Sequence, residues 1–272
     1  MKISALYVYP IKSLGGISLD HAQLSDRGLQ HDRRWMLIDE QGKFLTQRTF
    51  HEMALLQVGI EDSYLTVRHK TKDLGQLSID LHPQQGQEIQ VQVWNDIMMA
   101  WLIDEKAGEW FSHALGQTVH LVYMPDQSQR FVKEKYAIDG DLNSFSDGMP
   151  YLLLGEASIA DLNSRMDETL TIDRFRPNIV FEGGEPYAED NMDEISMGSS
   201  TFVGAKPCIR CNLITIDQAT AQAGKEPLAT MAGYRRIDNN IYMGMNLLLK
   251  EGHEIRVGDE ILVKSWREPL FA

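Results

Sequence analysis

The stretch KPCIRCNLITID, residues 206–217, contains both cysteines of this 272-residue chain, Cys208 and Cys211. The thiolate form of cysteine attacks and binds metals, and a guanidinium such as that of Arg210 favours this form. The β-branched residues after the pair predict a strand, whereas a thioredoxin-type dithiol sits where a strand meets a helix. A zinc site would need two more ligands from eight scattered histidines. Two interpretations stay open. In one, a single cysteine binds a soft metal and a non-protein cofactor supplies the other ligands. In the other, the two cysteines are simply small core residues.

The composition outside this stretch limits the classes of protein. A formal net charge of −13 repels nucleic acid, and 43% hydrophobic residues indicate a globular chain. No stretch has the apolar length that crosses a bilayer, and the N-terminus alternates like a strand and lacks the apolar core of a signal peptide. Two cysteines form no disulfide framework. We therefore expect a cytoplasmic protein that binds neither nucleic acid nor membrane.

Local patterns predict an α+β, strand-dominated fold. Strands are expected at residues 3–11, 63–69, 88–94, 119–125, 175–184 and 247–266, with a hairpin over 33–48 that turns at 39–42. Helices are expected over residues 105–116 and 155–166, and a short one after Pro227. The polar segment 127–150 is a domain boundary or an active-site loop. We expect a β-rich module at residues 1–120 and a β-barrel flanked by helices at residues 121–272.

Basic residues are few in this acidic chain, and several lie beside predicted turns. They are Lys12, Arg33, Arg34, Arg174, Arg176 and Arg210, and Ser13 follows the first of them. Arginine binds phosphate through a planar fork of N–H donors, and serine hydroxyls complete such sites. These residues predict a pocket for an anionic cofactor if they converge. The alternative is that each pairs with one of the abundant carboxylates.

Seven segments, in order along the chain, resemble MOSC-domain proteins that carry the MOSC N-terminal module. They are YPIKSLGG, DRRWMLID, FLTQR, FSDGMPYLLLGEASIADLNSRM, FRPNIVFEGGEPYAED, KPCIRCNLITID and GMNLLLKEG. Within that family the chain is similar to the mitochondrial amidoxime-reducing component and to bacterial YcbX-type proteins. The resemblance implies a MOSC N-terminal module at residues 1–120 and a MOSC β-barrel domain at residues 121–272.

The resemblance also implies a cofactor and its site. It implies a molybdenum–pyranopterin with a phosphate, with Cys211 as the metal ligand and Cys208 as a bystander that lines the site. The implied cofactor-binding residues are Lys12, Ser13, Arg33, Gly148, Met149, Arg176, Asn178, Ile209, Arg210 and Asn246. Gly148 and Met149 replace a Thr-Ser pair of the mitochondrial branch and Ile209 replaces a serine, so only backbone contacts carry over at these three positions. Asn246 replaces a tyrosine and can still donate and accept hydrogen bonds.

The implied activity is reduction of N-hydroxylated compounds, namely amidoximes, hydroxylamines and N-hydroxylated bases, by oxygen-atom removal at molybdenum. Cys211 and Arg210 are the implied catalytic residues, with Arg210 holding negative charge near the metal. Asp147 and Asp217 are candidate proton donors. The chain ends at Ala272 without the fused ferredoxin domain of some relatives, so we expect electrons from a separate ferredoxin, flavodoxin or flavin reductase.

Other functions remain open at this stage. One is a sulfur carrier with a cysteine persulfide, as in the C-terminal part of molybdenum-cofactor sulfurases; pyridoxal phosphate, which serves their desulfurase part, is not expected to bind here. Another is a carrier of the molybdenum cofactor without turnover. A redox-sensing thiol switch on a non-enzymatic barrel is the third.

Overall fold

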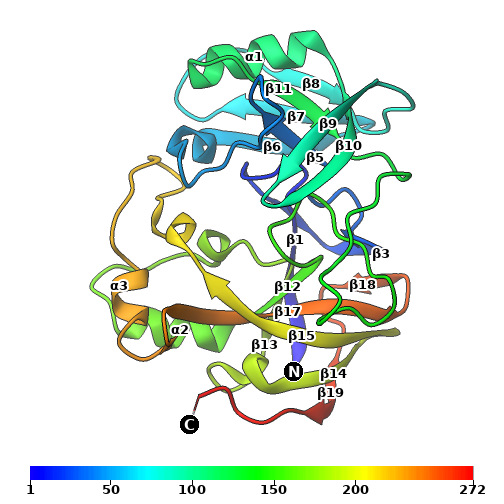
Figure 1. The fold of residues 1–272 in the computed structure, drawn as a ribbon. Coiled ribbons are helices and arrows are strands. Elements are labelled where there is room, and N and C mark those ends of the chain that lie inside the picture. The colour runs from blue at the N-terminus through cyan, green and yellow to red at the C-terminus, as the bar shows by residue number, and fades with distance from the viewer. Residues whose placement is uncertain (272) are drawn as a thin grey trace.

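A computed structural model describes residues 1–271, so the last residue of the predicted second domain lies outside it. The chain is strand-dominated α+β, as predicted (Figure 1). The strands are β1 (Lys2–Val8), β2 (Ile17–Leu19), β3 (His21–Ser25), β4 (Gly28–Leu29), β5 (Trp35–Ile38), β6 (Leu56–Glu61), β7 (Tyr64–His69), β8 (Leu77–Asp80), β9 (Gln87–Val93), β10 (Asp96–Leu102), β11 (His120–Tyr123), β12 (Tyr151–Gly155), β13 (Ile179–Glu182), β14 (Met192–Met197), β15 (Ser200–Arg210), β16 (Arg236–Ile237), β17 (Asn240–Glu251), β18 (Glu254–Arg256) and β19 (Ile261–Trp266). The helices are α1 (Glu105–Leu115), α2 (Glu156–Ser164) and α3 (Leu228–Met231), and the 3₁₀ helices are η1 (His51–Leu55), η2 (Ile172–Phe175), η3 (Ala188–Asn191) and η4 (Asn212–Thr215).

The largest sheet has nine strands and occupies the lower half of Figure 1. Its order is β19-β14-β15-β17-β12-β13-β1-β2, and β16 pairs with β17 off this path. The N-terminal strand β1 pairs antiparallel with β13, so the first residues of the chain belong to a sheet built mostly from the second half. This exchange brings the turn after β1 next to the strands that carry the cysteines.

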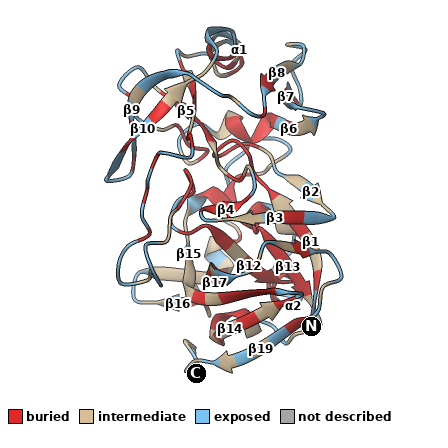
Figure 2. Ribbon diagram, turned by 90° about the vertical axis from the view of Figure 1, so that its right-hand side faces the viewer, coloured by how far each residue is buried: buried red, intermediate tan, exposed pale blue. Residues whose placement is uncertain are grey.

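The upper half of Figure 1 contains two smaller sheets and α1. One sheet has the order β5-β11-β10-β9 and the other the order β6-β7-β8. A third small sheet, β18-β3-β4, packs into the core of the lower half through Ala22, Leu29 and Ile255. Each half has its own buried core, seen as red strand segments in Figure 2. Trp35 and Phe111 are fully buried in the upper core, and Phe181 and Phe202 are buried in the lower one. The division at residues 120 and 121 stays a prediction.

Two local predictions are confirmed by their hydrogen bonds. The first helix begins after Asp104, whose carboxylate accepts from the backbone N–H of Lys106, and it ends at Gly116 with a left-handed φ of 69°. The predicted hairpin turn closes with the N–H of Gly42 donating to the carbonyl of Asp39 at 3.0 Å. Gly42 has a φ of +77°, a conformation that favours glycine.

The predicted strand after the cysteines is wrong. The strand β15 lies before and through the motif and ends at Arg210, and the next residues form the 3₁₀ turn η4. The hydroxyl of Thr215 donates to the carbonyl of Asn212 at 2.8 Å, which closes the turn locally. The turn buries Leu213 and Ile214, so tertiary packing overrides the strand propensity of these residues. The cysteines therefore sit at the end of a strand.

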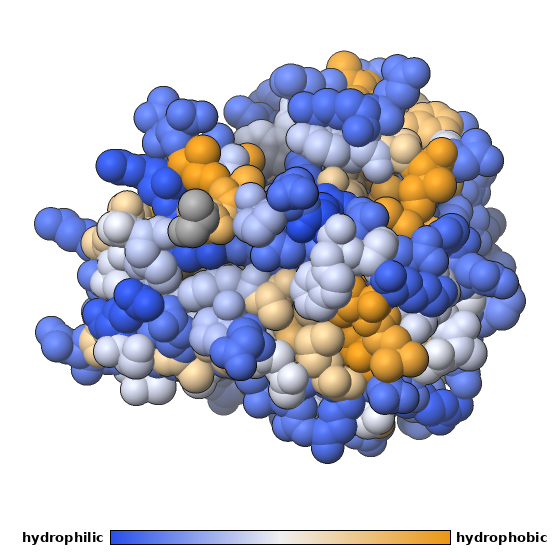
Figure 3. All heavy atoms as spheres, turned by 90° about the horizontal axis from the view of Figure 1, so that it is seen from below, coloured by the Kyte–Doolittle hydropathy of each residue, from blue (hydrophilic) through white to orange (hydrophobic). Residues whose placement is uncertain are grey.

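The segment between β11 and β12 has no helix or ladder strand within its described residues 124–150, although Phe131 and Leu142 form an isolated bridge. It crosses the boundary between the halves. None of the helices in the described chain is long and apolar enough to cross a membrane. Seen from below, the surface is mainly hydrophilic, and its apolar side chains form separate patches (Figure 3).

Candidate functional site

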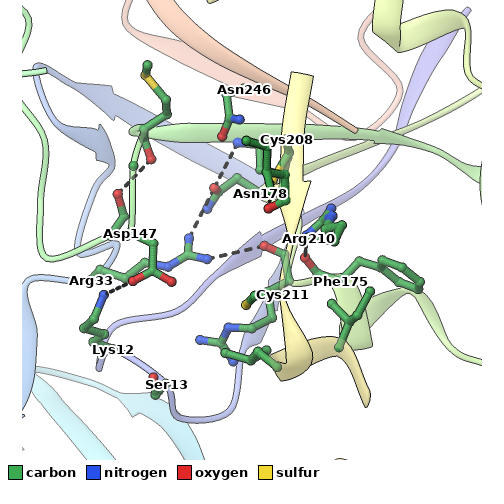
Figure 4. A pocket seen from close by; sticks show the side chains of 18 of the residues that line it. Lys12, Ser13, Arg33, Asp147, Phe175, Asn178, Cys208, Arg210, Cys211 and Asn246 are labelled. Atoms are coloured by element: carbon green, nitrogen blue, oxygen red, sulfur yellow. Dashed lines mark hydrogen bonds and ion pairs between the residues drawn. The ribbon is translucent and has the colours of Figure 1, made fainter. Parts of the chain in front are cut away.

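A cavity of about 380 Å³ lies where the two halves meet, and residues from distant parts of the sequence line it (Figure 4). All the residues predicted to bind cofactor or metal line it: Lys12, Ser13, Arg33, Gly148, Met149, Arg176, Asn178, Ile209, Arg210, Cys211 and Asn246. The structure brings them together because β1, β13, β15 and β17 are members of one sheet. Cys208 lines the same cavity.

The cavity is strongly basic in an acidic protein. Its charged lining, within the described residues, consists of six bases and one acid: Lys12, Arg33, Arg48, Arg176, Lys206, Arg210 and Asp147. The chain as a whole carries a formal charge of −13. A concentration of cations in a recess focuses a positive potential there and attracts anionic ligands. The convergence expected from the sequence is therefore present for Arg33, Arg176 and Arg210.

Two of the arginines beside predicted turns do not line the cavity. Arg34 donates to the carbonyl of Met124 and to the carboxylate of Asp126, at 2.7 Å for the latter. Arg174 donates to Asp217 at 3.0 Å, and neither residue of this pair lines the cavity. For these two arginines the pairing alternative holds, and Asp217 is removed from the candidate proton donors.

Lys12 and Asp147 form a charge pair on one wall of the cavity. The Lys12 Nζ atom donates to Asp147 Oδ1 and to the carbonyl of Phe145, both at 2.6 Å. Burial lowers the pKa of Lys12 to about 8, although Asp147 acts to raise it. Burial alone would raise the pKa of Asp147, but the charges of Lys12 and Arg48 hold it well below its ordinary value. Asp147 is thus ionised at neutral pH, which makes it a poor proton donor.

Tyr9 forms a platform under two of the guanidinium groups. The Arg33 and Arg176 guanidinium carbons lie 4.4 and 4.2 Å from the centroid of the Tyr9 ring. Both arginines adopt a left-handed backbone, with φ of 49° and 55°, which is uncommon outside glycine and often marks functional sites. Burial and the charge of Arg33 lower the pKa of Arg176 to about 10. Asn178 accepts a hydrogen bond from Arg33 at 3.2 Å.

Two buried guanidinium nitrogens test whether an anionic group fits. Arg176 Nη2 and Arg210 Nη2 are buried and have no hydrogen-bond partner within residues 1–271. A buried donor without a partner costs about 1–3 kcal/mol, and both arginines line the cavity. A bound phosphate or pterin oxygen would satisfy them. The donor set therefore fits an anionic, phosphate-bearing cofactor, with the Cys211 thiolate available to a soft metal.

The cation that contacts Cys211 is Arg48, which sequence reasoning missed. Arg48 Nη1 lies 3.5 Å from Cys211 Sγ and 3.1 Å from Asp147 Oδ2. The guanidinium of Arg210, expected beside the thiolate, instead donates to the carbonyls of Met243 and Phe175, both at 2.9 Å. Cys208 Sγ donates to the carbonyl of Ile209 at 3.8 Å.

Trp94 and Lys206 also line the cavity and were not predicted. Trp94 is at the tip of the β9–β10 hairpin, and its ring stacks on Arg48 at 4.5 Å while its Nε1 donates to Asp147 at 3.3 Å. The FLTQR segment, which contains Arg48, was a matching motif, so this residue had a sequence signal. The described residues include no group of three or more His, Cys, Asp or Glu side chains arranged to hold a metal ion.

Comparisons with known proteins match both halves of the chain. Residues 1–118 match the MOSC N-terminal beta barrel domain, and residues 141–262 match the MOSC domain. Mitochondrial amidoxime-reducing component 1 of Mus musculus is 34% identical over 278 residues, covering 95% of this chain and 81% of the relative. The molybdenum cofactor sulfurase of Solanum lycopersicum is 30% identical over 288 residues, covering 96% of this chain.

The chain spans 35% of the length of that sulfurase, so it matches only part of the larger protein. Among solved structures, the YUAD protein of Bacillus subtilis covers 96% of this chain with a TM-score of 0.42 and 9% identity. The sequence relatives thus come from two groups of proteins, amidoxime-reducing components and molybdenum cofactor sulfurases.

Proposed function

Since this chain belongs to the MOSC-domain family, we propose that it is a molybdenum-cofactor-dependent reductase of N-hydroxylated compounds. The substrates are amidoximes, hydroxylamines and N-hydroxylated bases. One observation carries the proposal: the lining of one cavity combines six basic residues with Cys211, which lies in contact with Arg48. This chain aligns with 81% and 82% of the length of two relatives named as amidoxime-reducing components, which supports an enzyme of that kind.

Each part of the cavity has a proposed task in holding the cofactor. Cys211 binds molybdenum through its thiolate. Lys12, Arg33, Arg176 and Arg210 bind the phosphate and the pterin, because charged N–H donors form strong hydrogen bonds to anionic oxygens. Contacts from side chains or backbone come from Ser13, Gly148, Met149, Asn178, Ile209 and Asn246. When bound, the cofactor supplies a metal that exchanges two electrons during oxygen-atom removal from nitrogen.

The chain's own residues then orient and stabilise this site. Asp147 stays ionised and accepts from Lys12 Nζ, from the Arg48 guanidinium and from Trp94 Nε1, so it fixes three donors at once. Arg48 places its positive charge against the sulfur of Cys211. This contact holds a cation 3.5 Å from the sulfur that lines the cavity. Neither Asp147 nor Asp217 serves as the proton donor in this proposal.

A reductase also needs a source of electrons. The sequence has two cysteines, and iron–sulfur clusters of the four-cysteine type cannot be bound by two. We propose a ferredoxin, flavodoxin or flavin reductase as the electron donor, in the cytoplasm. An acidic donor protein would dock through a local basic patch, since the protein as a whole is acidic.

The test is reduction of benzamidoxime by protein produced with cofactor supply, using reduced methyl viologen as the electron donor. The proposal predicts benzamidine, with no product from the Cys211→Ser variant. Molybdenum-loaded protein that forms no benzamidine would contradict the reductase. Release of thiocyanate from molybdenum-free protein on treatment with cyanide would favour the second candidate, a sulfur carrier with a Cys211 persulfide, which the sulfurase match supports.

A further inference from the structure

A second cavity, of about 990 Å³, adjoins the cavity that contains Cys211. Arg48 and Trp94 line both cavities and so lie at the boundary between them. Other lining residues of the second cavity come from the 39–50 hairpin region and the tip of the β9–β10 hairpin. No task in the proposed function has been given to this cavity.

The two cavities are close enough for one molecule to occupy both. Cys211 lines the first cavity and the next residue, Asn212, lines the second. The Cα atoms of consecutive residues are about 3.8 Å apart. Arg48, shared by both cavities, reaches within 3.5 Å of the Cys211 sulfur. A molecule seated in the second cavity thus needs only a short extension past Arg48 to reach the reactive sulfur.

The second cavity has an aromatic lining that is partly exposed. Phe44, Phe50 and Trp94 line it, and the side chains of Phe50 and Trp94 are 37% and 46% exposed. The rings of Phe44 and Trp94 meet edge to face, with centroids 5.2 Å apart. Large apolar side chains are usually buried, and aromatic groups in a concave site typically bind the apolar part of a ligand. The cavity therefore suits a flat apolar group.

Trp94 is held in this position by several contacts. Its backbone has a positive φ of 56°, which is unfavourable for a bulky residue. The indole is fixed by Arg48 on its face and by the hydrogen bond from Nε1 to Asp147. These contacts keep the ring rigid at the boundary of the two cavities, and a preorganised aromatic surface loses little entropy when it binds a ligand.

The charges around the second cavity balance. Its described lining has two acids, Asp39 and Glu40, and two bases, Lys43 and Arg48. The Asp39 carboxylate already accepts from the backbone N–H groups of Gln41 and Lys43 at the turn. The remaining polar lining is neutral amide and hydroxyl groups. This balance contrasts with the basic first cavity and favours an uncharged group.

We propose that the second cavity binds the planar, uncharged body of the substrate, while the N-hydroxy group extends past Arg48 into the Cys211 cavity. This inference rests on the proposed function, because it names the part of the substrate that lies away from the reaction. Phe50 and Trp94 select substrates with an aromatic body over small ones. A substrate without such a body uses the first cavity alone.

Steady-state kinetics of the molybdenum-loaded protein with benzamidoxime and with hydroxylamine test the inference. Phe50→Ala is the main variant, because Phe50 lines only the second cavity. The loss of one ring contact is expected to raise KM for benzamidoxime about tenfold, with KM for hydroxylamine and the molybdenum content unchanged. Trp94→Ala is expected to act in the same direction. Equal changes for both substrates, or no change for benzamidoxime, would overturn the inference.

A control variant and a binding assay separate this inference from the reductase proposal. Ile97→Ala removes a side chain that is 62% exposed on the same hairpin and lines neither cavity, so both KM values should stay at the parent level. Calorimetric titration of the unmutated protein with benzamidoxime needs no turnover. If benzamidoxime binds the unmutated protein and binds Phe50→Ala more weakly, the assignment of the second cavity is supported even when reduction fails. If benzamidoxime does not bind, or binds both proteins equally, the assignment is contradicted.

Discussion

Arg48 Nη1 lies 3.5 Å from the sulfur of Cys211, and the two residues are 163 positions apart in the sequence. Arg48 follows the hairpin of the upper half, whereas Cys211 follows the last residue of β15 in the lower half. Their contact joins the two halves at the cavity. Asp147, from the segment between β11 and β12, accepts from the same guanidinium and completes the junction. The candidate site therefore requires both halves of the fold.

Replacing Arg48 tests whether its charge activates the thiol. Arg48→Ala removes the cation that lies 3.5 Å from the sulfur of Cys211, and alkylating agents react with the thiolate form of cysteine. The rate of Cys211 alkylation by iodoacetamide at pH 7, followed by peptide mass spectrometry, should fall about three- to tenfold. Arg165→Ala removes an exposed arginine paired with Asp161 and should leave the rate unchanged. An unchanged rate in Arg48→Ala would show that the contact has no electrostatic role.

The charge of Lys12 should make anion binding by the cofactor-free protein depend on pH. Burial lowers the pKa of Lys12 to about 8, so its positive charge is present at pH 7 and is lost as the pH rises through that value. The affinity for sulfate, whose charge is constant in this range, should fall between pH 7 and pH 9 in calorimetric titrations. Lys12→Met should bind sulfate more weakly at pH 7 and lose most of the pH dependence.

The matched control for this titration is Lys250→Met. Lys250 is an exposed lysine that pairs with Glu194, far from the cavity lining. The Lys250→Met variant should bind sulfate with the same affinity as the unmutated protein at every pH. A pH dependence that persists in Lys12→Met would assign the titration to another group and remove Lys12 from the anion site.

The sequence predicted the residues of the cavity better than their contacts. The motifs around Lys12, Arg33, Arg176 and Cys211 were found because each is a short local pattern, and strand pairing then brought them together. Arg48 and Trp94 were missed because their roles depend on the docking of hairpins onto a distant strand end. The turn at residues 212–215 has strand-like residues, and only its burial makes it a turn. Local patterns thus predicted elements and donor groups, whereas long-range packing decided the partner of Cys211.

The buried carboxyl group of Glu189, in the lower half, should make the free energy of unfolding depend on pH. Its carboxylate is fully buried and accepts from the Ser158 hydroxyl at 2.8 and 2.9 Å. Burial, followed by the charge of Asp190, raises the pKa of Glu189 to about 7 from an ordinary value of 4.5. The contribution of Glu189 to stability is therefore complete below the ordinary value and is lost as the pH rises through about 7.

A Glu189→Gln variant removes this titration. Relative to the unmutated protein, the variant's free energy of unfolding should improve by about 1–3 kcal/mol between pH 5 and pH 8, measured by urea denaturation. Glu168→Gln, at an exposed position, should show no such change. A difference that is the same at both pH values would mean that Glu189 is ionised throughout this range.

We propose above that the basic cavity holds a molybdenum cofactor through Cys211. The most direct test of this proposal is the molybdenum content of the protein produced with cofactor supply, measured by mass spectrometry beside Cys208→Ser and Cys211→Ser. We expect near-stoichiometric molybdenum in the unmutated protein and in Cys208→Ser, and almost none in Cys211→Ser. No molybdenum in the unmutated protein, or equal loss in both cysteine variants, would contradict it.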